Sequence, residues 1–235
     1  MGRIIAIANQ KGGVGKTTTA INLSACLAEK GQRVLVVDID PQGNTTSGLG
    51  IAKDNVDNAI CKDIFENLDI IPSNVNLAGA EIDLIDIENR EYILKNAINT
   101  VRNNYDYVIL DCPPSLSMLT VNAMTAADTV LVPIQCEFYA LDGLSQLIYT
   151  IELIQESLNP DLYIEGVVFT MYDARTNLSL QVVENVKDNL NQNIYKTIIP
   201  RNVRLAEAPS YGMPINLYDP KSKGTESYLL LAEEV

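Results

Sequence analysis

Several residue types and patterns are missing from this sequence, and each absence narrows its interpretation. It contains no histidine, so no imidazole can act as a base or a metal ligand. No stretch approaches about 18 uninterrupted apolar residues, which excludes a transmembrane helix. The cysteines are scattered without a CxxC pair, which indicates reduced, partly buried thiols: Cys26, Cys61, Cys112 and Cys136. The first residues show no signal peptide, so we expect a cytoplasmic protein.

Positive charge is also scarce. The 235 residues include 17 lysines and arginines against 30 aspartates and glutamates, which gives a net charge of −13. Such a chain repels the phosphates of nucleic acid as a whole, so composition alone argues against nucleic-acid binding. It does not exclude a local basic patch on an otherwise acidic surface.

The chain is long enough for one sizeable core, because 47% of its residues are hydrophobic, and we predict a single domain spanning residues 1–235. Apolar runs typical of buried strands alternate with segments of helical periodicity. This alternation predicts an α/β fold with a mostly parallel, twisted sheet and helices on both faces. The expected strands lie at residues 4–8, 33–38, 68–72, 107–111, 129–133, 164–170 and 194–198. The expected helices lie at residues 20–28, 90–102, 141–158 and 177–190 and from 222 to the end, with a loop at 41–50 and an irregular charged segment at 52–67.

A glycine-rich segment, KGGVGKTT at residues 11–18, lies between an expected buried strand and an expected helix. A loop of this kind directs backbone N–H groups and the positive end of the helix toward one point, which is typical of a phosphate site. Lys16 is expected to reach the β- and γ-phosphates of a nucleotide, and the Thr17 hydroxyl to bind Mg²⁺. The alternative is a glycine turn with surface lysines.

One position departs from the usual phosphate-binding pattern GxxxxGK[ST]. Gln10 stands where the pattern has its first glycine, and an additional lysine, Lys11, follows it. Lys11 cannot easily serve the same phosphates as Lys16 from the same loop. The segment resembles the deviant Walker A box, in which the early lysine reaches across a dimer to the nucleotide of the partner subunit.

Three aspartates are expected at the carboxyl ends of the strands, where ligands bind in this architecture. Asp111 ends an apolar strand, as does the acid that holds Mg²⁺ in P-loop enzymes, although an acid here could also cap a following helix. Strand alternation is expected to point Asp38 and Asp40 to the same side. We expect Asp38 to order the waters of the metal and Asp40 to orient the attacking water, unless Asp40 is only a turn residue before Pro41.

Six segments together resemble the ParA/Soj family of chromosome-partitioning ATPases, in order and spacing, over nearly the whole chain. They are residues 11–18, 38–44 (DIDPQGN), 111–114 (DCPP), 133–143 (PIQCEFYALDG), 173–177 (DARTN) and 199–204 (IPRNVR). The first segment alone would also admit MinD and related ATPases, whereas the later ones narrow the resemblance to the Soj-like branch. The segment from about residue 52 to 68 is shorter than in such proteins, a departure that lies outside the expected active site.

The resemblance implies a P-loop NTPase fold and a slow, partner-stimulated ATPase that converts ATP and water to ADP and phosphate with Mg²⁺. It implies that Lys11 acts in trans, that Lys16 and Asp40 are catalytic, and that Asp111 supports the metal together with Thr17 and Asp38. Pro200 and Asn202 fall where the family contacts adenine, although such a loop is about as often only a turn. The residues that it assigns to the phosphates are Lys11, Gly12, Gly13, Val14, Gly15, Lys16, Thr17 and Thr18.

Proteins similar to this one form a homodimer with ATP and then bind double-stranded DNA without sequence preference, in chromosome or plasmid segregation. The resemblance therefore implies a nucleoid-associated protein with a ParB-like partner. The matching basic positions are Arg175 and Arg204, to which Lys221 and Lys223 can add. The alternative for each is an ordinary surface charge.

Two other functions would each require a further feature in the sequence. A MinD-like membrane-associated positioning ATPase would need a C-terminal basic amphipathic helix, whereas residues 228–235 (YLLLAEEV) are acidic. A metabolic P-loop enzyme, such as an amidoligase or small-molecule kinase, would need a substrate domain or a second catalytic constellation, and neither is visible in the sequence.

Overall fold

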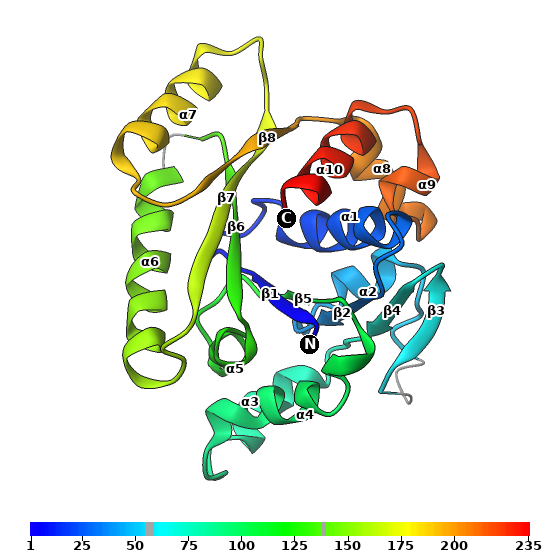
Figure 1. Cartoon of the computed structure of the whole chain (residues 1–235), viewed down its shortest axis with the longest axis vertical. Coiled ribbons are helices and arrows are strands. Elements are labelled where there is room, and N and C mark those ends of the chain that lie inside the picture. Colours follow the sequence, from blue (N-terminus) through cyan, green and yellow to red (C-terminus); the bar gives the residue numbers. More distant parts are fainter. Residues whose placement is uncertain (55–58, 138–139) are drawn as a thin grey trace.

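The computed structural model describes residues 1–54, 59–137 and 140–235, which form one eight-stranded sheet with helices on both sides (Figure 1). The strand order is β3-β4-β2-β5-β1-β6-β7-β8. All neighbouring strands are parallel except β3 and β4. The strands are β1 (Arg3–Ile7), β2 (Val34–Asp38), β3 (Cys61–Phe65), β4 (Leu68–Ile71), β5 (Tyr107–Asp111), β6 (Thr129–Gln135), β7 (Tyr163–Tyr172) and β8 (Ile194–Pro200). The predicted α/β fold with a mostly parallel sheet is confirmed.

The helices divide between the two faces of the sheet (Figure 1). One face is covered by α1 (Lys16–Glu29), α8 (Val203–Glu207), α9 (Ile215–Tyr218) and α10 (Lys223–Glu234). The other is covered by α4 (Ile93–Asn99), α5 (Met118–Ala126), α6 (Ala140–Ser157) and α7 (Asn177–Asn189), while α2 (Asn44–Gly48) and α3 (Leu77–Asp83) follow the ends of β2 and β4. Short 3₁₀ turns lie at Arg90–Tyr92, Arg102–Asn104 and Ala208–Tyr211. Among the described residues, no helix combines the length and the apolar character needed to cross a bilayer.

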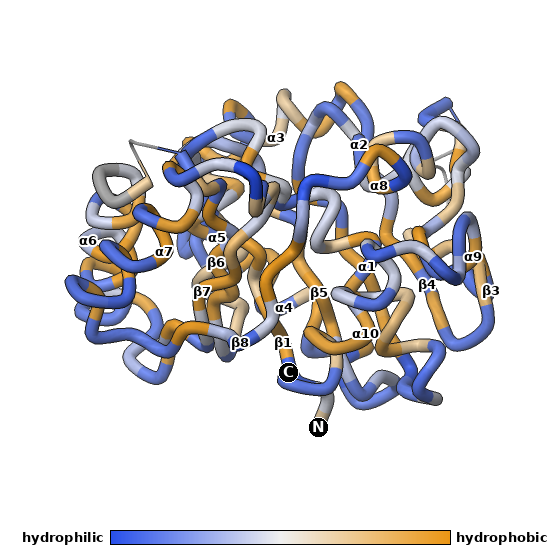
Figure 2. The backbone as a smooth tube through the Cα atoms, turned by 90° about the horizontal axis from the view of Figure 1, so that it is seen from above, coloured by the Kyte–Doolittle hydropathy of each residue, from blue (hydrophilic) through white to orange (hydrophobic). Residues whose placement is uncertain are grey.

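Strand alternation divides the buried side chains between two hydrophobic cores. In β1, Ile4 and Ala6 pack in the core under α5, α6 and α7, whereas Ile5 and Ile7 pack in the core under α1 and α10. All four side chains are fully buried. Figure 2 shows the same pattern as a hydrophobic band along the central strands, with hydrophilic segments around it. A sheet buried on both faces explains the near-continuous apolar runs in the sequence.

The structure corrects several predicted elements. Strand β3 lies inside the segment expected to be irregular, and α2 lies inside the expected loop at 41–50. The helix expected at 90–102 is only α4, with a 3₁₀ turn on either side, and α3 and α5 were not predicted at all. Residues 55–58 of the short segment and residues 138–139 of the 133–143 motif lie outside the described residues.

The register of the central strands positions the functional edge of the sheet. In the β2–β5 pair Asp38 lies opposite Asp111, and in the β1–β5 pair Ile7 lies opposite Asp111. The glycine loop follows β1 directly, so the loop and both aspartates meet at the carboxyl ends of three adjacent strands.

We predict that Asn159 stabilises the junction between α5 and α6. Its Nδ2 donates hydrogen bonds to the carbonyl oxygens of Met124 and Ala127, at 2.9 and 2.8 Å, and the side chain is buried. Asn159→Leu leaves both carbonyls buried without this donor, so the free energy of unfolding in urea should fall by about 1–3 kcal/mol. The control is Asn189→Leu at an exposed position of α7, with an expected change below about 0.5 kcal/mol. Equal stability of the two variants would contradict this role.

Candidate active site

The glycine loop joins β1 to α1 in a conformation that depends on its glycines. Gly13 and Gly15 have φ angles of 74° and 90°, in the left-handed region that side chains other than glycine rarely adopt. Helix α1 begins at Lys16, and no side chain caps its first turn. The backbone N–H groups of this turn are therefore available to an anion at the positive end of the helix.

Lys16 is the first residue of α1, and its side chain turns back to the glycine loop. Its side chain is largely buried, and its Nζ donates a hydrogen bond to the carbonyl oxygen of Lys11 at 3.0 Å. Burial lowers the pKa of Lys16, and the nearby carboxylates of Asp111 and Asp40 partly oppose this effect. A buried ammonium that donates a hydrogen bond to a neutral carbonyl is suited to receive a negatively charged ligand.

Asp111 connects the loop to the segment after β2. Its Oδ2 accepts hydrogen bonds from the hydroxyls of Thr17 at 2.9 Å and Thr45 at 2.6 Å. Its Oδ1 is buried, and no described residue donates a hydrogen bond to it. Burial, followed by repulsion from Asp38, raises the pKa of Asp111 to about 7. The structure thus brings Thr17 and Asp111 together as the sequence predicts and adds Thr45, which sequence reasoning missed.

Asp38 and Asp40 are held by backbone and hydroxyl donors. Asp38 Oδ2 accepts from the backbone N–H of Thr46 at 2.8 Å and from its hydroxyl at 2.7 Å, and Oδ1 accepts from the N–H of Asp40 at 3.2 Å. Asp40 Oδ1 accepts from the N–H of Gln42 at 2.9 Å. Burial raises the pKa of Asp38, and the hydrogen bonds from Thr46 oppose that shift.

Strand alternation does not orient Asp38 and Asp40 together, contrary to the prediction from the sequence. Strand β2 ends at Asp38, so Asp40 lies in a turn that is closed by a hydrogen bond from the N–H of Gly43 to the carbonyl of Asp40 at 2.8 Å. The turn, and not the pleat of a strand, orients the Asp40 carboxylate. Both aspartates nevertheless lie buried at the same edge of the sheet.

The oxygen atoms of this edge fit a Mg²⁺ ion that is shared with a phosphate. Among the described residues there is no group of three His, Cys, Asp or Glu side chains placed to hold a metal alone. Mg²⁺ prefers hard oxygen ligands and is usually bound by one or two carboxylates together with substrate phosphates. Asp111 Oδ1, to which no described residue donates, and the hydroxyl oxygen of Thr17 are oxygen ligands of this kind.

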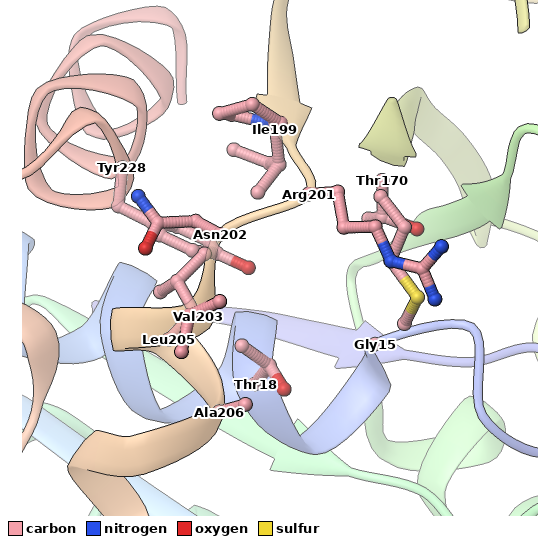
Figure 3. A pocket seen from close by; sticks show the side chains of 12 residues that line it. Gly15, Thr18, Thr170, Ile199, Arg201, Asn202, Val203, Leu205, Ala206 and Tyr228 are labelled. Carbon is pink, nitrogen blue, oxygen red and sulfur yellow. The ribbon is translucent and has the colours of Figure 1, made fainter. Parts of the chain in front are cut away.

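A pocket of about 330 Å³ lies beside the loop, within the size range of small-molecule sites (Figure 3). It is lined by Gly15 and Thr18, by the ends of β7 and β8, and by α8 and Tyr228 of α10. Pro200 and Asn202, the two residues predicted to contact adenine, both line it. Asn202 Oδ1 accepts a hydrogen bond from the N–H of Arg204 at 2.8 Å and so caps α8.

Two further pocket residues were missed by sequence reasoning. Arg201 stands between Pro200 and Asn202, and its side chain extends toward Thr170 and Gly15 in Figure 3. Met171 has a φ angle of 51°, which is strained for a residue with a long side chain and marks this part of β7 as unusual. The neighbouring Thr170 hydroxyl donates to the carbonyl of Val14 at 2.8 Å and fixes the loop against β7.

The Lys11 side chain is paired with an acid of its own chain. Its Nζ forms an ion pair with Glu137 Oε2 at 2.7 Å, and both side chains are partly exposed. Its backbone N–H donates to Asn9 Oδ1 at 2.9 Å, and Asn9 in turn donates to the carbonyl of Pro133 at 2.8 Å. Within one chain, the Lys11 side chain therefore contacts Glu137, just after β6, whereas its backbone carbonyl accepts the hydrogen bond from Lys16.

The predicted DNA-binding arginines are both paired with acids. Arg175 forms hydrogen bonds with both carboxylate oxygens of Asp173, at 2.9 and 2.7 Å, and remains highly exposed. Arg204 pairs with Glu207 at 2.8 Å and with Asp219 at 3.3 Å.

The two candidate lysines differ in their surroundings. Lys223 pairs with Glu226 at 2.8 Å, whereas Lys221 is exposed and has no ion pair with any described residue. Three of the four predicted DNA-binding residues therefore form ion pairs with acidic side chains of the same chain.

Comparison with known proteins assigns the chain to a family. The model of the AAA domain family matches residues 2–164. The sporulation initiation inhibitor protein Soj of Bacillus subtilis is 61% identical over 249 residues, covering 100% of this chain and 98% of the relative. The chromosome partitioning protein ParA of Myxococcus xanthus is 52% identical, covering 100% of this chain and 88% of the relative.

Solved structures agree with the fold. A crystal structure named cobyrinic acid a,c-diamide synthase from Mycobacterium smegmatis, with bound ADP and magnesium, has a TM-score of 0.87 at 39% identity and covers 99% of this chain and 93% of that chain. MinD from Pyrococcus horikoshii, complexed with Mg-ADP, has a TM-score of 0.84 at only 28% identity and covers 100% of this chain and 96% of that chain. Since full-length identity is higher for the partitioning proteins than for these structures, the chain belongs to the ParA/Soj family of P-loop chromosome-partitioning ATPases.

Proposed function

We propose that the chain hydrolyses ATP with Mg²⁺ and uses ATP to switch between monomer and dimer in chromosome or plasmid partition, with residues 1–235 acting as one domain. The observation that best supports this proposal is that Lys16, Thr17 and Asp111 lie close together. They lie beside the turn that contains Asp38 and Asp40. The full-length similarity to Soj and ParA proteins supports the biological setting.

In the proposed site, the phosphates lie over the start of α1, where backbone N–H groups and the Lys16 ammonium face them. Thr17 and Asp111 hold the metal, and Asp38 supports it through its waters. Mg²⁺, when bound, neutralises charge on the phosphates. Because phosphoryl transfer depends mainly on positioning and charge neutralisation, the buried carboxylate of Asp40 acts by orienting the attacking water.

The nucleotide base lies in the pocket lined by Pro200 and Asn202. The side-chain amide of Asn202 provides a donor toward the base, and the apolar walls of the pocket cover its faces. Arg201 adds a cation at the pocket rim beside Gly15.

Dimerisation supplies the cation that a single chain lacks at the transferred phosphate. Lys11 leaves Glu137 and reaches the nucleotide of the partner subunit. The Lys11–Glu137 pair is partly exposed, and pairs of this kind contribute less than about 1 kcal/mol, so exchange for a phosphate is not prevented. Hydrolysis is therefore slow in the monomer and depends on the dimer.

The output of the switch is non-specific binding of double-stranded DNA by the ATP dimer, with Arg175, Arg204, Lys221 and Lys223 in the contact surface. A ParB-like partner stimulates hydrolysis and releases the dimer, and the protein is cytoplasmic and nucleoid-associated. Since acids accompany most of these cations in the single chain, two subunits are needed to gather enough positive charge.

One observation favours a different class. The structure similar to this chain at 39% identity is named as a diamide synthase, which would be a metabolic ligase. Turnover of ATP without any added acceptor distinguishes the two, because a ligase would require its small-molecule substrates. Preference for vesicles over DNA would instead favour a MinD-like function.

Asp40→Asn is predicted to retain ATP binding and to lose hydrolysis by roughly 100-fold or more, because the water loses its orienting carboxylate. The asparagine keeps an acceptor for the N–H of Gln42, so the turn should persist. Phosphate release measures hydrolysis, and sedimentation should show an accumulated ATP dimer. Asp161→Asn, at an exposed position, is the control. A variant that stays monomeric at saturating ATP would contradict this role.

Lys11→Ala is predicted to impair dimerisation and turnover far more than ATP affinity. Mixing it with Lys16→Ala should restore some activity, because a mixed dimer keeps one Lys16 facing one intact Lys11. Glu137→Gln is the matched control, since it removes the ion pair but keeps Lys11, and it should dimerise normally. If mixed dimers form without any rescue, Lys11 acts within its own chain.

Arg175→Glu and Arg204→Glu are predicted to abolish DNA binding while the ATP-dependent dimer persists. Asp173→Asn and Glu207→Gln should strengthen binding, because each removes a negative charge that lies beside one of these arginines. Binding to unrelated duplexes should weaken steeply between about 50 and 200 mM salt. Lys62→Glu, on the opposite edge strand β3, is the control and should bind normally. Tight binding by the ADP form would overturn the scheme.

A further inference from the structure

Ser73 is a buried polar residue that sequence reasoning did not single out. It follows the end of β4 directly, after Pro72, and its side chain is almost fully buried. Strand β4 pairs in parallel with β2, with Ile71 opposite Val37, so the segments that follow the two strands leave the sheet side by side. A buried hydroxyl normally has a hydrogen-bond partner, and the partner of Ser73 lies in the turn that holds Asp40.

The Ser73 hydroxyl holds the Asp40 turn, residues 40–43, from outside. It donates a hydrogen bond to the carbonyl oxygen of Asp40 at 2.8 Å. The same oxygen accepts a hydrogen bond from the N–H of Gly43, also at 2.8 Å, which closes the turn. Two donors therefore fix this carbonyl. A change in the backbone of Asp40 that breaks these hydrogen bonds would also redirect its carboxylate.

Two backbone contacts hold Ser73 itself in place. Its N–H donates to the hydroxyl of Thr46 at 2.8 Å, and that hydroxyl donates to Asp38 Oδ2 at 2.7 Å. Its carbonyl oxygen lies so close to Gly43 that a Cβ atom there would be only 2.6 Å away. Gly43 has a φ angle of 59°, so this position requires glycine for its conformation and for its space. The hydroxyl therefore approaches Asp40 from a fixed position.

The hold on the turn bears on the rate of hydrolysis more than on nucleotide binding. The Asp40 carboxylate accepts from the N–H of Gln42 within the same turn, so its direction depends on the shape of the turn. A group that orients a water acts only in a narrow range of positions, and a small displacement is costly. The glycine loop is fixed by a separate hydrogen bond, from the Thr170 hydroxyl to the carbonyl of Val14.

We propose that Ser73 is a positioning residue for ATP hydrolysis, which acts through the Asp40 turn and does not itself contact the nucleotide. Its hydroxyl keeps the Asp40 carbonyl, and with it the carboxylate, in the orientation that directs the attacking water. The effect on hydrolysis rests on the proposed ATPase function, whereas the hold on the turn does not.

Amide hydrogen exchange in the nucleotide-free chain tests the hold on the turn, because it reports local opening without any hydrolysis. Ser73→Ala removes the hydroxyl and keeps the N–H that bonds Thr46. The Gly43 amide should then exchange roughly 3-fold faster or more, since the carbonyl that it bonds has lost its second donor. Ser73→Thr keeps a hydroxyl, and its methyl can enter the cavity of about 420 Å³ that Ser73 lines, so exchange should stay unchanged. Unchanged exchange in Ser73→Ala would overturn the proposal.

Steady-state kinetics test the effect on hydrolysis. Ser73→Ala should lower kcat by roughly 3- to 10-fold, as expected for the loss of one neutral hydrogen bond, and should leave the KM for ATP within about 2-fold. Ser73→Thr should restore kcat. The matched control is Ser24→Ala, which removes a buried hydroxyl of α1 that has no hydrogen-bond partner among the described residues, and it should change neither constant. Equal losses of kcat in the two alanine variants, or a rise in KM without a fall in kcat, would contradict a positioning role.

A combined variant shows whether Ser73 acts through Asp40. In the Asp40→Asn chain, which already lacks the orienting carboxylate, Ser73→Ala should cause no further loss of single-turnover hydrolysis. A further loss of the same size would mean an independent effect and would overturn the proposed route. A chain that hydrolyses no ATP under any condition would instead refute the proposed function, and the exchange rates of Gly43 alone would then decide whether Ser73 holds the turn.

Discussion

The hydrogen bonds to the Asp111 carboxylate are the contacts on which the rest of the site depends. A buried carboxylate is costly unless donors surround it, and here the donors are Thr17 at the start of α1 and Thr45 in α2. One side chain on β5 therefore joins the glycine loop to the segment that follows β2. Because β2 and β1 flank β5 in parallel, the two loops leave the sheet at the same edge, on either side of Asp111. A displacement of either loop would therefore change the hydrogen bonds that the other loop makes with the Asp111 carboxylate.

The same burial links ligand binding to stability. Burial lowers the pKa of Lys16 and raises that of Asp111 to about 7, so both charged forms are disfavoured in the folded chain. A phosphate beside Lys16 and a cation beside Asp111 would compensate both costs. Binding to the folded state alone stabilises a protein by about 2.7 kcal/mol when the ligand is present at 100 times its Kd. A nucleotide would therefore stabilise the folded chain at the edge of the sheet where burial disfavours the charged forms of Lys16 and Asp111.

The central strands and the glycine loop could be predicted because their signals are local: continuous apolar runs, turn glycines and a helix start. Helix α5 was not predicted, because seven of its nine residues are buried. Its sequence therefore lacks the alternation of apolar and polar faces that marks a surface helix. In the site, Thr17 and Asp111 were predicted from their motifs. Thr45 and Arg201 were not, since their roles arise from contacts between distant segments. The orientation of Asp40 depends on a hydrogen-bonded turn that strand alternation does not describe.

The outer strand β3 affects whether chains pair edge to edge in a concentrated solution. It is the antiparallel end of the sheet, its Lys62 and Asp63 are exposed, and Asp63 has a φ angle of 51°. The pairing with β4 is irregular between Cys61 and Phe65. A flat, apolar edge would offer unpaired backbone groups to another chain, whereas a charged and bent one does not. The side of the sheet farthest from β8 is thereby protected against edge-to-edge aggregation.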